Sequence, residues 1–379
     1  MMAFYEGIGL GVTTDRQTVV LDIGYAYTKY GFTGEAAPRG FIRTEAALPE
    51  NKSRVKIFDH LQDDKLYDLL VEFIHHLYFR KLLVSPKDRR VVIVESLLCP
   101  TSFRDTLAKV FFRHFDVASL LFLPSQLAAL CTLGTDTALL VDLGYREATV
   151  VPVYAGVPVL RAWQAQPIAG EAVERRIREQ LAASEGSPCD LSSEQIEDIK
   201  VRTCFVTTLE RSQKLSEVKP PPSVDYPVAC GRHITVPGNL RETAFEVLFE
   251  EDGDQLSLSN LILDAILECA TDARRPLAEN IFIVGGTAMV PGLRARLRDE
   301  MRQLLGLERY ASKLSLPNLK FHRAPAKENY AAWLGGAIFG ATDSLVSRSL
   351  TKESYMKTNC VPDWANLYYN RPSSEQMCL

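Results

Sequence analysis

A short motif occurs twice in this chain, and this repeat restricts the possible folds more than any other feature. The segments VLDIGY at residues 20–25 and LVDLGY at residues 140–145 match position by position. In each, a run of apolar residues predicts a buried strand that ends in an aspartate and a glycine turn. The repeat therefore predicts two half-molecules built on the same plan.

Apolar strand patterns alternate with helical patterns along most of the chain. We predict strands at 19–23, 90–98, 119–123, 138–143, 148–154, 281–284 and 319–322, and helices at 66–77, 102–114, 125–133, 171–182, 194–209, 241–250, 259–269, 293–304 and 331–345. Residues 39–65 are polar and are predicted to be mainly loop. Because uniformly apolar strands are typical of sheets covered on both faces, we expect an α/β fold with layered, mostly buried sheets.

Composition excludes several classes of protein. The 379 residues include 43 basic and 47 acidic ones, and this balance argues against a nucleic-acid-binding protein. The eight cysteines form no C-x-x-C pair and are typical of reduced thiols in a cytosolic protein. No signal peptide is recognisable, and the most apolar stretch, residues 117–133, is broken by a Pro-Ser-Gln sequence. We therefore expect a cytoplasmic protein that inserts into no membrane.

The repeated motif suits a phosphate site. A glycine after a strand lets backbone amides approach phosphate oxygens, and a carboxylate beside it faces Mg²⁺ or its waters. Asp22 with Gly24 and Asp142 with Gly144 are the candidate pairs. Ordinary turns also contain Asp-x-Gly, so a purely structural role stays open.

Paired glycines follow the predicted strand at 281–284. Gly285, Gly286 and Thr287 lie where this strand meets a helix, which would let a flat ligand such as adenine approach the backbone. The alternative is a tight strand-to-helix turn with no ligand.

Taken in chain order, these segments resemble the actin family, whose fold is shared with sugar kinases and Hsp70-type chaperones. Residues 22–39 and 141–156 are similar to the two phosphate loops of the family, and residues 198–205 to the segment near the ribose. Residues 284–292 and 324–338 are similar to the adenosine side and the C-terminal helix. The resemblance implies a two-lobed actin-like α/β fold of the ribonuclease H-like superfamily.

The resemblance also implies a domain organisation. The outer domain would comprise residues 1–132 and 331–379, with a reduced pointed-end subdomain at about 40–64. The inner domain would comprise residues 133–330, with a further subdomain at about 169–242. Conventional actin carries a longer segment where this chain has only residues 40–65, and that segment grips the next protomer. Most of that grip is therefore expected to be absent.

A nucleotide site follows from the same resemblance, with ATP or ADP and Mg²⁺ as ligands. The residues implied to bind the nucleotide are Asp22, Gly24, Lys29, Asp142, Gly144, Lys200, Gly285, Gly286, Thr287 and Tyr330, and Asp22 and Asp142 would hold Mg²⁺ through water. No residue is assigned a catalytic role.

Several positions depart from the family pattern. The groups that contact phosphate, orient the attacking water or contact the ribose and adenine are replaced by Tyr25, Ala26, Ser125, Tyr145, Arg146, Thr149, Val201 and Asn329. Gln126 lies one residue out of register with the glutamine that positions water in the family. Because no group is left to orient the attacking water, we expect no efficient ATP hydrolysis.

Within the family, residues 72–96, 198–206 and 220–227 are similar to an actin-related subunit at the pointed end of dynactin, the cofactor of dynein. This similarity implies a non-polymerising cytoskeletal protein. Its partners would be the centractin-type filament, the other pointed-end complex subunits and, indirectly, dynein. An ATP-hydrolysing enzyme and a nuclear chromatin-remodelling subunit are the alternative functions.

The short segment contains apolar side chains that allow two interpretations. Phe41, Ile42, Val55, Ile57 and Phe58 would form either an exposed docking patch for non-actin partners or a small local core.

Overall fold

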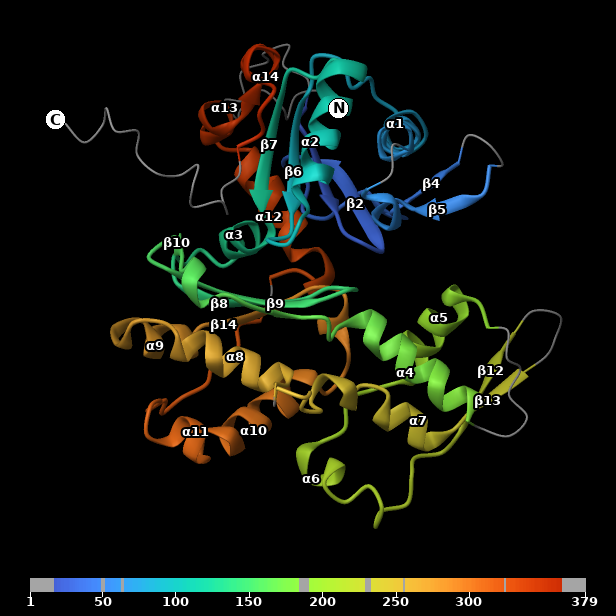
Figure 1. Ribbon diagram of the computed structural model, residues 1–379, viewed down its shortest axis with the longest axis vertical. Helices are drawn as coiled ribbons and strands as arrows, with labels where there is room; N and C mark the ends of the chain where they lie inside the picture. The colour runs from blue at the N-terminus through green and yellow to red at the C-terminus, as the bar shows by residue number, and fades with distance from the viewer. Residues whose placement is uncertain are drawn as a thin grey trace, which may run out of the picture.

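The chain folds into two lobes, one above the other in Figure 1. A computed structural model describes residues 17–48, 52–62, 65–183, 191–228, 233–254, 256–323 and 325–362. Each lobe is built on its own sheet, and helices cover the sheet faces, as the α/β expectation required. Among the described residues, no helix combines the length and the apolar character needed to cross a membrane.

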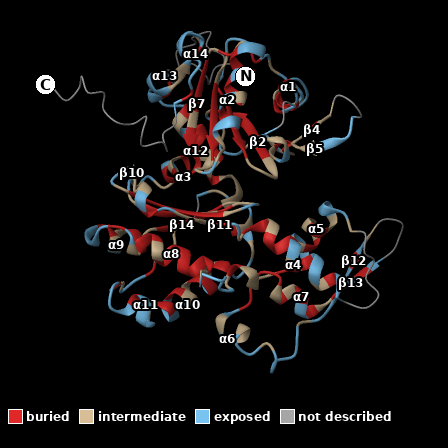
Figure 2. Cartoon of the chain, viewed as in Figure 1, coloured by how far each residue is buried: buried red, intermediate tan, exposed pale blue. Residues whose placement is uncertain are grey.

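The outer lobe contains a six-stranded sheet in the order β15-β7-β6-β1-β2-β3. β1, β6 and β7 are parallel, and β2, β3 and β15 pair antiparallel with their neighbours. The sheet consists of β1 (Val19–Ile23), β2 (Tyr27–Phe32), β3 (Gly40–Arg43), β6 (Arg90–Glu95), β7 (Ser119–Pro124) and β15 (Leu350–Thr351). Its central strands are buried, as the red arrows in Figure 2 show.

The inner lobe repeats the same plan. Here β8 pairs parallel with β14 and antiparallel with β9, as β1 pairs parallel with β6 and antiparallel with β2. The sheet consists of β8 (Ala138–Leu143), β9 (Ala148–Tyr154), β10 (Val157–Pro158), β11 (Gln164–Gln166) and β14 (Ile281–Val284). The two copies of the sequence motif thus occupy equivalent hairpins, β1–β2 and β8–β9.

Helices of the outer lobe flank its sheet. They are α1 (Leu66–His76), α2 (Thr101–Lys109), α3 (Ser125–Cys131), α12 (Ala331–Gly340), α13 (Ser344–Arg348) and α14 (Lys352–Thr358), with π-helical turns at Leu77–Leu82 and Val110–His114. The predicted helix at 331–345 is therefore divided into α12 and α13.

Helices of the inner lobe lie below its sheet and to one side of it in Figure 1. They are α4 (Gly170–Ala182), α5 (Ser193–Thr203), α6 (Leu209–Ser212), α7 (Gly238–Thr243), α8 (Leu258–Leu267), α9 (Thr271–Ala278), α10 (Leu293–Leu305) and α11 (Glu308–Ala311). The small hairpin of β12 (Val224–Pro227) and β13 (His233–Val236) lies at one end of this lobe. The predicted helix 194–209 ends at Thr203, and α9 was not predicted.

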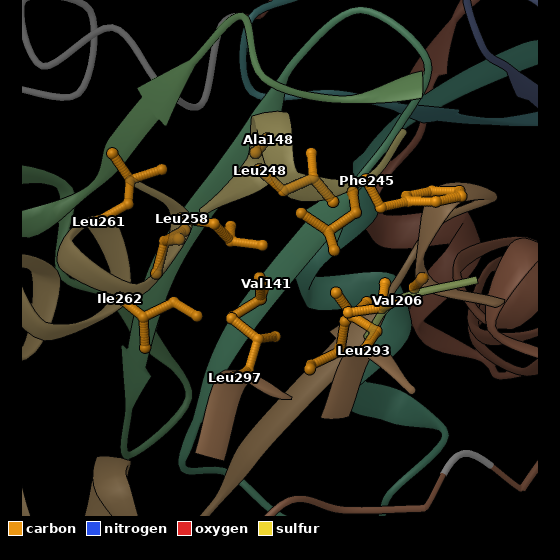
Figure 3. Close-up of a cluster of buried hydrophobic side chains, with 14 of the residues drawn as sticks. Val141, Ala148, Val206, Phe245, Leu248, Leu258, Leu261, Ile262, Leu293 and Leu297 are labelled. Carbon is orange, nitrogen blue, oxygen red and sulfur yellow. The ribbon is translucent and has the colours of Figure 1, made fainter. Parts of the chain in front are cut away.

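The core of the inner lobe holds the sheet and its helices together. Figure 3 shows Val141 of β8 among leucine and isoleucine side chains from α8 and α10, including Leu258, Ile262 and Leu297. These side chains are completely buried. Burying one such side chain contributes about 1.5–3 kcal/mol, so this core fixes the position of the β8–β9 hairpin.

Helix α12 returns the chain to the outer lobe, where it packs against α3, β1 and β6. Trp333, fully buried, donates its indole N–H to the carbonyl oxygen of Val20 at 3.0 Å. Gly335 lies so close to α3 that a Cβ atom would be 1.6 Å from the carbonyl oxygen of Ala128. The α3–α12 contact thus depends on the absence of a side chain at this position.

Much of the described part of residues 39–65 forms regular structure, and the prediction of mainly loop is wrong. Besides β3, the segment contains the β4 (Glu45–Ala47) and β5 (Arg54–Lys56) hairpin and a 3₁₀ turn at Ile57–His60, here called the short arm. Buried Thr44 fixes its base, because its hydroxyl lies 2.9 Å from that of Thr28 and donates to the carbonyl oxygen of Gly24 at 2.7 Å. These partners are distant in sequence, so a local reading misses them.

The short arm also resolves the two interpretations of its apolar residues in favour of a local core. Ile57 is completely buried, and Ile42, Val55 and Phe58 are half-buried against the outer-lobe core. Only Phe41, 43% exposed, has the exposure expected of a docking patch.

The strand predicted at 319–322 is not formed, and only one bridge, between Ile281 and Phe321, is present there. The domain limits at 132/133 and 330/331 stay predictions.

Candidate nucleotide site between the lobes

A cavity of about 550 Å³ lies between the two lobes. It is bounded by the turns of the two equivalent hairpins, each closed by a backbone hydrogen bond: Gly24 N–H to Tyr27 O at 3.1 Å, and Gly144 N–H to Glu147 O at 3.2 Å. The predicted binding residues that line it are Asp22, Gly24, Lys29, Asp142, Gly144, Lys200, Gly285, Gly286 and Thr287. The structure therefore brings together residues from five separate stretches of the chain.

Tyr330 is placed differently. Its neighbours Glu328 and Asn329 line the cavity, whereas its own ring lies edge-on to Phe41 with ring centroids 6.5 Å apart. Its predicted contact with a nucleotide stays a prediction.

Two carboxylates face the cavity from the ends of β1 and β8. Lys29 Nζ lies 2.9 Å from Asp22 Oδ2, and Ser125 Oγ donates to Asp142 Oδ2 at 3.4 Å. Burial raises the pKa of Asp142 to about 6, and the charge of Asp22 acts in the same direction while Lys29 opposes both. A second cation near this pair would stabilise the ionised form of Asp142. The pair is thus suited to a hydrated Mg²⁺ ion.

A larger metal-binding cluster is not present in the described ranges, which contain no group of three or more His, Cys, Asp or Glu side chains placed to hold an ion. Any Mg²⁺ at the cavity would depend on the two aspartates, its waters and the ligand itself.

The strand-to-helix turn after β14 must carry glycine. Gly285 has φ +102°, and a Cβ atom would lie 2.2 Å from the carbonyl oxygen of Leu143 and 2.8 Å from Asp142 Oδ1. Thr287 fixes this turn to the other one, because its hydroxyl donates to the carbonyl oxygen of Gly144 at 2.7 Å. The turn thus offers bare backbone to the cavity.

Helix α5 and the residue after it also line the cavity. Val201, 70% exposed, and Cys204 contribute apolar surface, and Met289 and Val290 add to the apolar lining. Lys200 is held by Glu174 of α4, with Nζ 2.7 Å from Glu174 Oε1. Glu174 was not predicted, because its position in a regular amphipathic helix gives no signal that it faces Lys200.

The same glutamate also fixes a tyrosine that lines the cavity beside Lys200. The hydroxyl of Tyr145 donates to Glu174 Oε2 at 2.9 Å. Its ring stacks on that of Tyr25 from the opposite lobe, with centroids 5.7 Å apart and planes at 10°. Both rings line the cavity where the family pattern has small polar residues.

Gln126, one residue out of register with the family's water-positioning glutamine, is directed into the protein rather than into the cavity. Gln126 is 1% exposed, and its Nε2 lies 3.4 Å from the hydroxyl of Thr149, which is 2% exposed. Gln126 Oε1 is buried, and no partner for it is found in the described part of the chain. Ser125 and Thr149 line the cavity, but both are neutral hydroxyls.

The fold and this site define the class of protein. The family model for actin matches residues 13–191 and 190–359, so the chain belongs to the actin family. Members of this family typically bind ATP or ADP with Mg²⁺ in their fold.

Two curated relatives refine this assignment. The chain is 26% identical to "Actin-related protein 10" of Dictyostelium discoideum, over 93% of this chain and 90% of the relative. It is 24% identical to "Putative actin-29" of the same organism, over 90% of this chain and 95% of the relative. The chain is thus similar along nearly its whole length to an actin-related protein.

Proposed function

We propose that this protein is a non-polymerising actin-related subunit that caps the pointed end of the dynactin filament in the cytoplasm. There it would link the centractin-type filament to the other pointed-end complex subunits and so support dynein-driven transport along microtubules. The short arm carries this proposal, because it stands where conventional actin has the longer segment that grips the next protomer.

The geometry of the short arm explains how a filament would end at this subunit. Its strands β4 and β5 are three residues each, and its apolar side chains turn inward to the outer-lobe core. A subunit with an ordinary lower half can bind the end of a filament but offers little area to a further subunit above it. Such a head-to-tail contact does not propagate, and the filament stops.

A nucleotide is compatible with the cleft residues. Gly285–Thr287 and the apolar wall of α5 suit a nucleoside, and Asp22 and Asp142 suit Mg²⁺ through water. When bound, the ion would neutralise phosphate charge beside the two aspartates. The chain's own groups hold these parts in place: Lys29 pairs with Asp22, and Thr287 fixes the glycine turn.

The protein is proposed not to be an enzyme. Activation of water for attack on phosphate needs a group that accepts a proton or orients the water. Gln126 is buried against Thr149, and the hydroxyls of Ser125 and Thr149 are poor bases at neutral pH. Phosphate release at the rate of filamentous actin, abolished by Asp142→Asn, would instead establish the alternative of an ATP-hydrolysing enzyme.

A filament assay tests the capping proposal. Centractin-type filaments with blocked barbed ends are mixed with the purified chain, and pointed-end growth is followed by fluorescence microscopy. We expect growth to stop at substoichiometric amounts of the chain, and the chain alone at micromolar concentration to remain in the supernatant on sedimentation. Filaments formed by the chain alone, or pointed ends that keep growing, would contradict the proposal. Copurification with chromatin rather than with dynactin would favour the nuclear alternative.

A further inference from the structure

A row of four stacked aromatic rings crosses from the outer lobe to the inner one. Phe103 of α2 stacks on Phe58 of the short arm at 4.6 Å, and Phe58 stacks on Tyr25 at 5.4 Å. Tyr25 then stacks on Tyr145 of the inner lobe at 5.7 Å. Phe103 is 2% exposed, so the row begins in the outer-lobe core and ends on the β8–β9 turn. Neither turn could form this stack without the other lobe.

Each lobe also places a cation near the other lobe's tyrosine. Lys56 Nζ of the short arm lies 5.3 Å from the ring centroid of Tyr145, and the guanidinium of Arg146 lies 5.2 Å from that of Tyr25. Cations within about 6 Å of an aromatic face are attracted to it. The hydroxyls are fixed as well, because Tyr25 donates to Asp59 and Tyr145 donates to Glu174. Contacts from both lobes therefore fix the positions of the two rings.

A second set of contacts joins the lobes at α5. Glu197 of α5 accepts hydrogen bonds from the Tyr27 hydroxyl at 2.9 Å and from Arg43 at 3.0 Å. Arg43 also lies 3.3 Å from Glu194, and its guanidinium lies 5.1 Å from the ring centroid of Tyr27. The side chains of Arg43 and Glu197 are 28% and 24% exposed, so solvent screens this pair only in part.

We propose that these two sets of side chains form a clasp that holds the lobes closed without any ligand between them. Two-lobed proteins commonly close by hinge motion around a bound ligand, which then supplies the contacts that join the lobes. Here the chain supplies those contacts itself. The closed arrangement is accordingly independent of the nucleotide state of the cleft, whether or not the protein caps a filament.

Hydrogen exchange on the purified full chain, stripped of nucleotide with apyrase and EDTA, tests this proposal. The amides of Gly24 and Gly144 report opening of the two turns. Tyr25→Ala and Tyr145→Ala should each accelerate their exchange by about 2- to 12-fold, the factor that one aromatic pair contributes. The double variant should show no further acceleration from loss of the stack, since either single change removes it.

A matched control is the ring of Phe79, which is 44% exposed and lies 4.7 Å from His75 within the outer lobe. Phe79→Ala removes an aromatic contact of similar size and should leave exchange at both turns unchanged. If an alanine variant fails to fold by circular dichroism, Glu197→Gln is used in its place, because it weakens the second set of contacts without removing a ring.

Small-angle X-ray scattering of the wild-type chain independently tests whether the lobes stay closed without nucleotide. We expect the same radius of gyration with and without added Mg-ATP. Expansion of the wild type on nucleotide removal would overturn the proposal. Unchanged turn exchange in the folded Tyr25→Ala and Tyr145→Ala variants would overturn it equally.

Discussion

Replacing Gly335 with alanine should separate α3 from α12 and destabilise the outer lobe. The new Cβ atom would lie 1.6 Å from the carbonyl oxygen of Ala128 and 2.3 Å from its carbonyl carbon. These are backbone atoms, so no rotamer change relieves the overlap, and one helix must move. The position is also next to Trp333, which ties α12 to β1.

The expected magnitude combines two opposing effects. Overpacking a core costs about 1–3 kcal/mol, and a clash with backbone belongs at the upper end. Alanine in place of glycine inside a helix stabilises the helix by about 1 kcal/mol. We therefore expect a net loss of about 2 kcal/mol, which lowers Tm by roughly 2–3 °C for a chain of 379 residues, at an unfolding entropy of about 2.1 cal/mol/K per residue. Thermal unfolding followed by circular dichroism measures this shift.

Two other glycines provide graded controls. At Gly336 a Cβ atom would meet the methyl groups of Val94 at 2.6 Å and of Val20 at 3.3 Å, which are side-chain rather than backbone atoms, so Gly336→Ala should cost about 1 kcal/mol, less than Gly335→Ala. At Gly253 a Cβ atom would have no neighbour within 4 Å, and Gly253→Ala should have almost no effect. If the Gly335→Ala and Gly336→Ala variants have the same Tm, the argument from backbone overlap is wrong.

Three further predictions use single side chains. Arg296 is 3% exposed and binds Glu246 through two hydrogen bonds, so Arg296→Met should leave a buried carboxylate uncompensated and cost about 3–5 kcal/mol, measured by urea unfolding. Arg176 holds the pKa of Glu250 below its usual value, and such a group contributes stability above its unfolded pKa that is lost as pH falls. Arg176→Gln should therefore lower Tm at pH 7 but much less at pH 3; an equal loss at both would exclude this linkage. Ile57→Asp should abolish cooperative unfolding of the outer lobe, whereas Phe41→Asp, at a 43% exposed position, should leave it intact; a folded Ile57→Asp variant would restore the docking interpretation.

Local sequence pattern was sufficient for several strands whose apolar run ends at a polar turn, although β6 ends at Glu95 and not at the predicted residue 98. The strands at 19–23, 138–143, 148–154 and 281–284 have the predicted limits, because such runs are buried and Asp or Gly interrupts them. The repeated motif also located the two equivalent hairpins. The carboxylate pair and the glycine turn could thus be predicted as parts of one site from the residues and the family resemblance.

Features that depend on distant partners were not predictable in this way. The short arm is ordered by Thr28 and by the outer-lobe core rather than by its own polar sequence. Tyr25 and Tyr145 were recognised as departures from the family pattern, but no local rule indicates that the two rings stack.

The return of the C-terminal segment to the outer lobe has a consequence for synthesis on the ribosome. The outer lobe is complete only after two late segments have been synthesised. These are Trp333, which contacts β1, and β15 at Leu350–Thr351, which pairs with β7. The strands of the inner-lobe sheet all lie between residues 138 and 284 and emerge much earlier. Domains usually fold in the order in which they are made, but here the half made first is finished last. The nascent chain therefore exposes apolar strands for most of its translation, and a truncation before Ala331 should leave the first half dependent on chaperones.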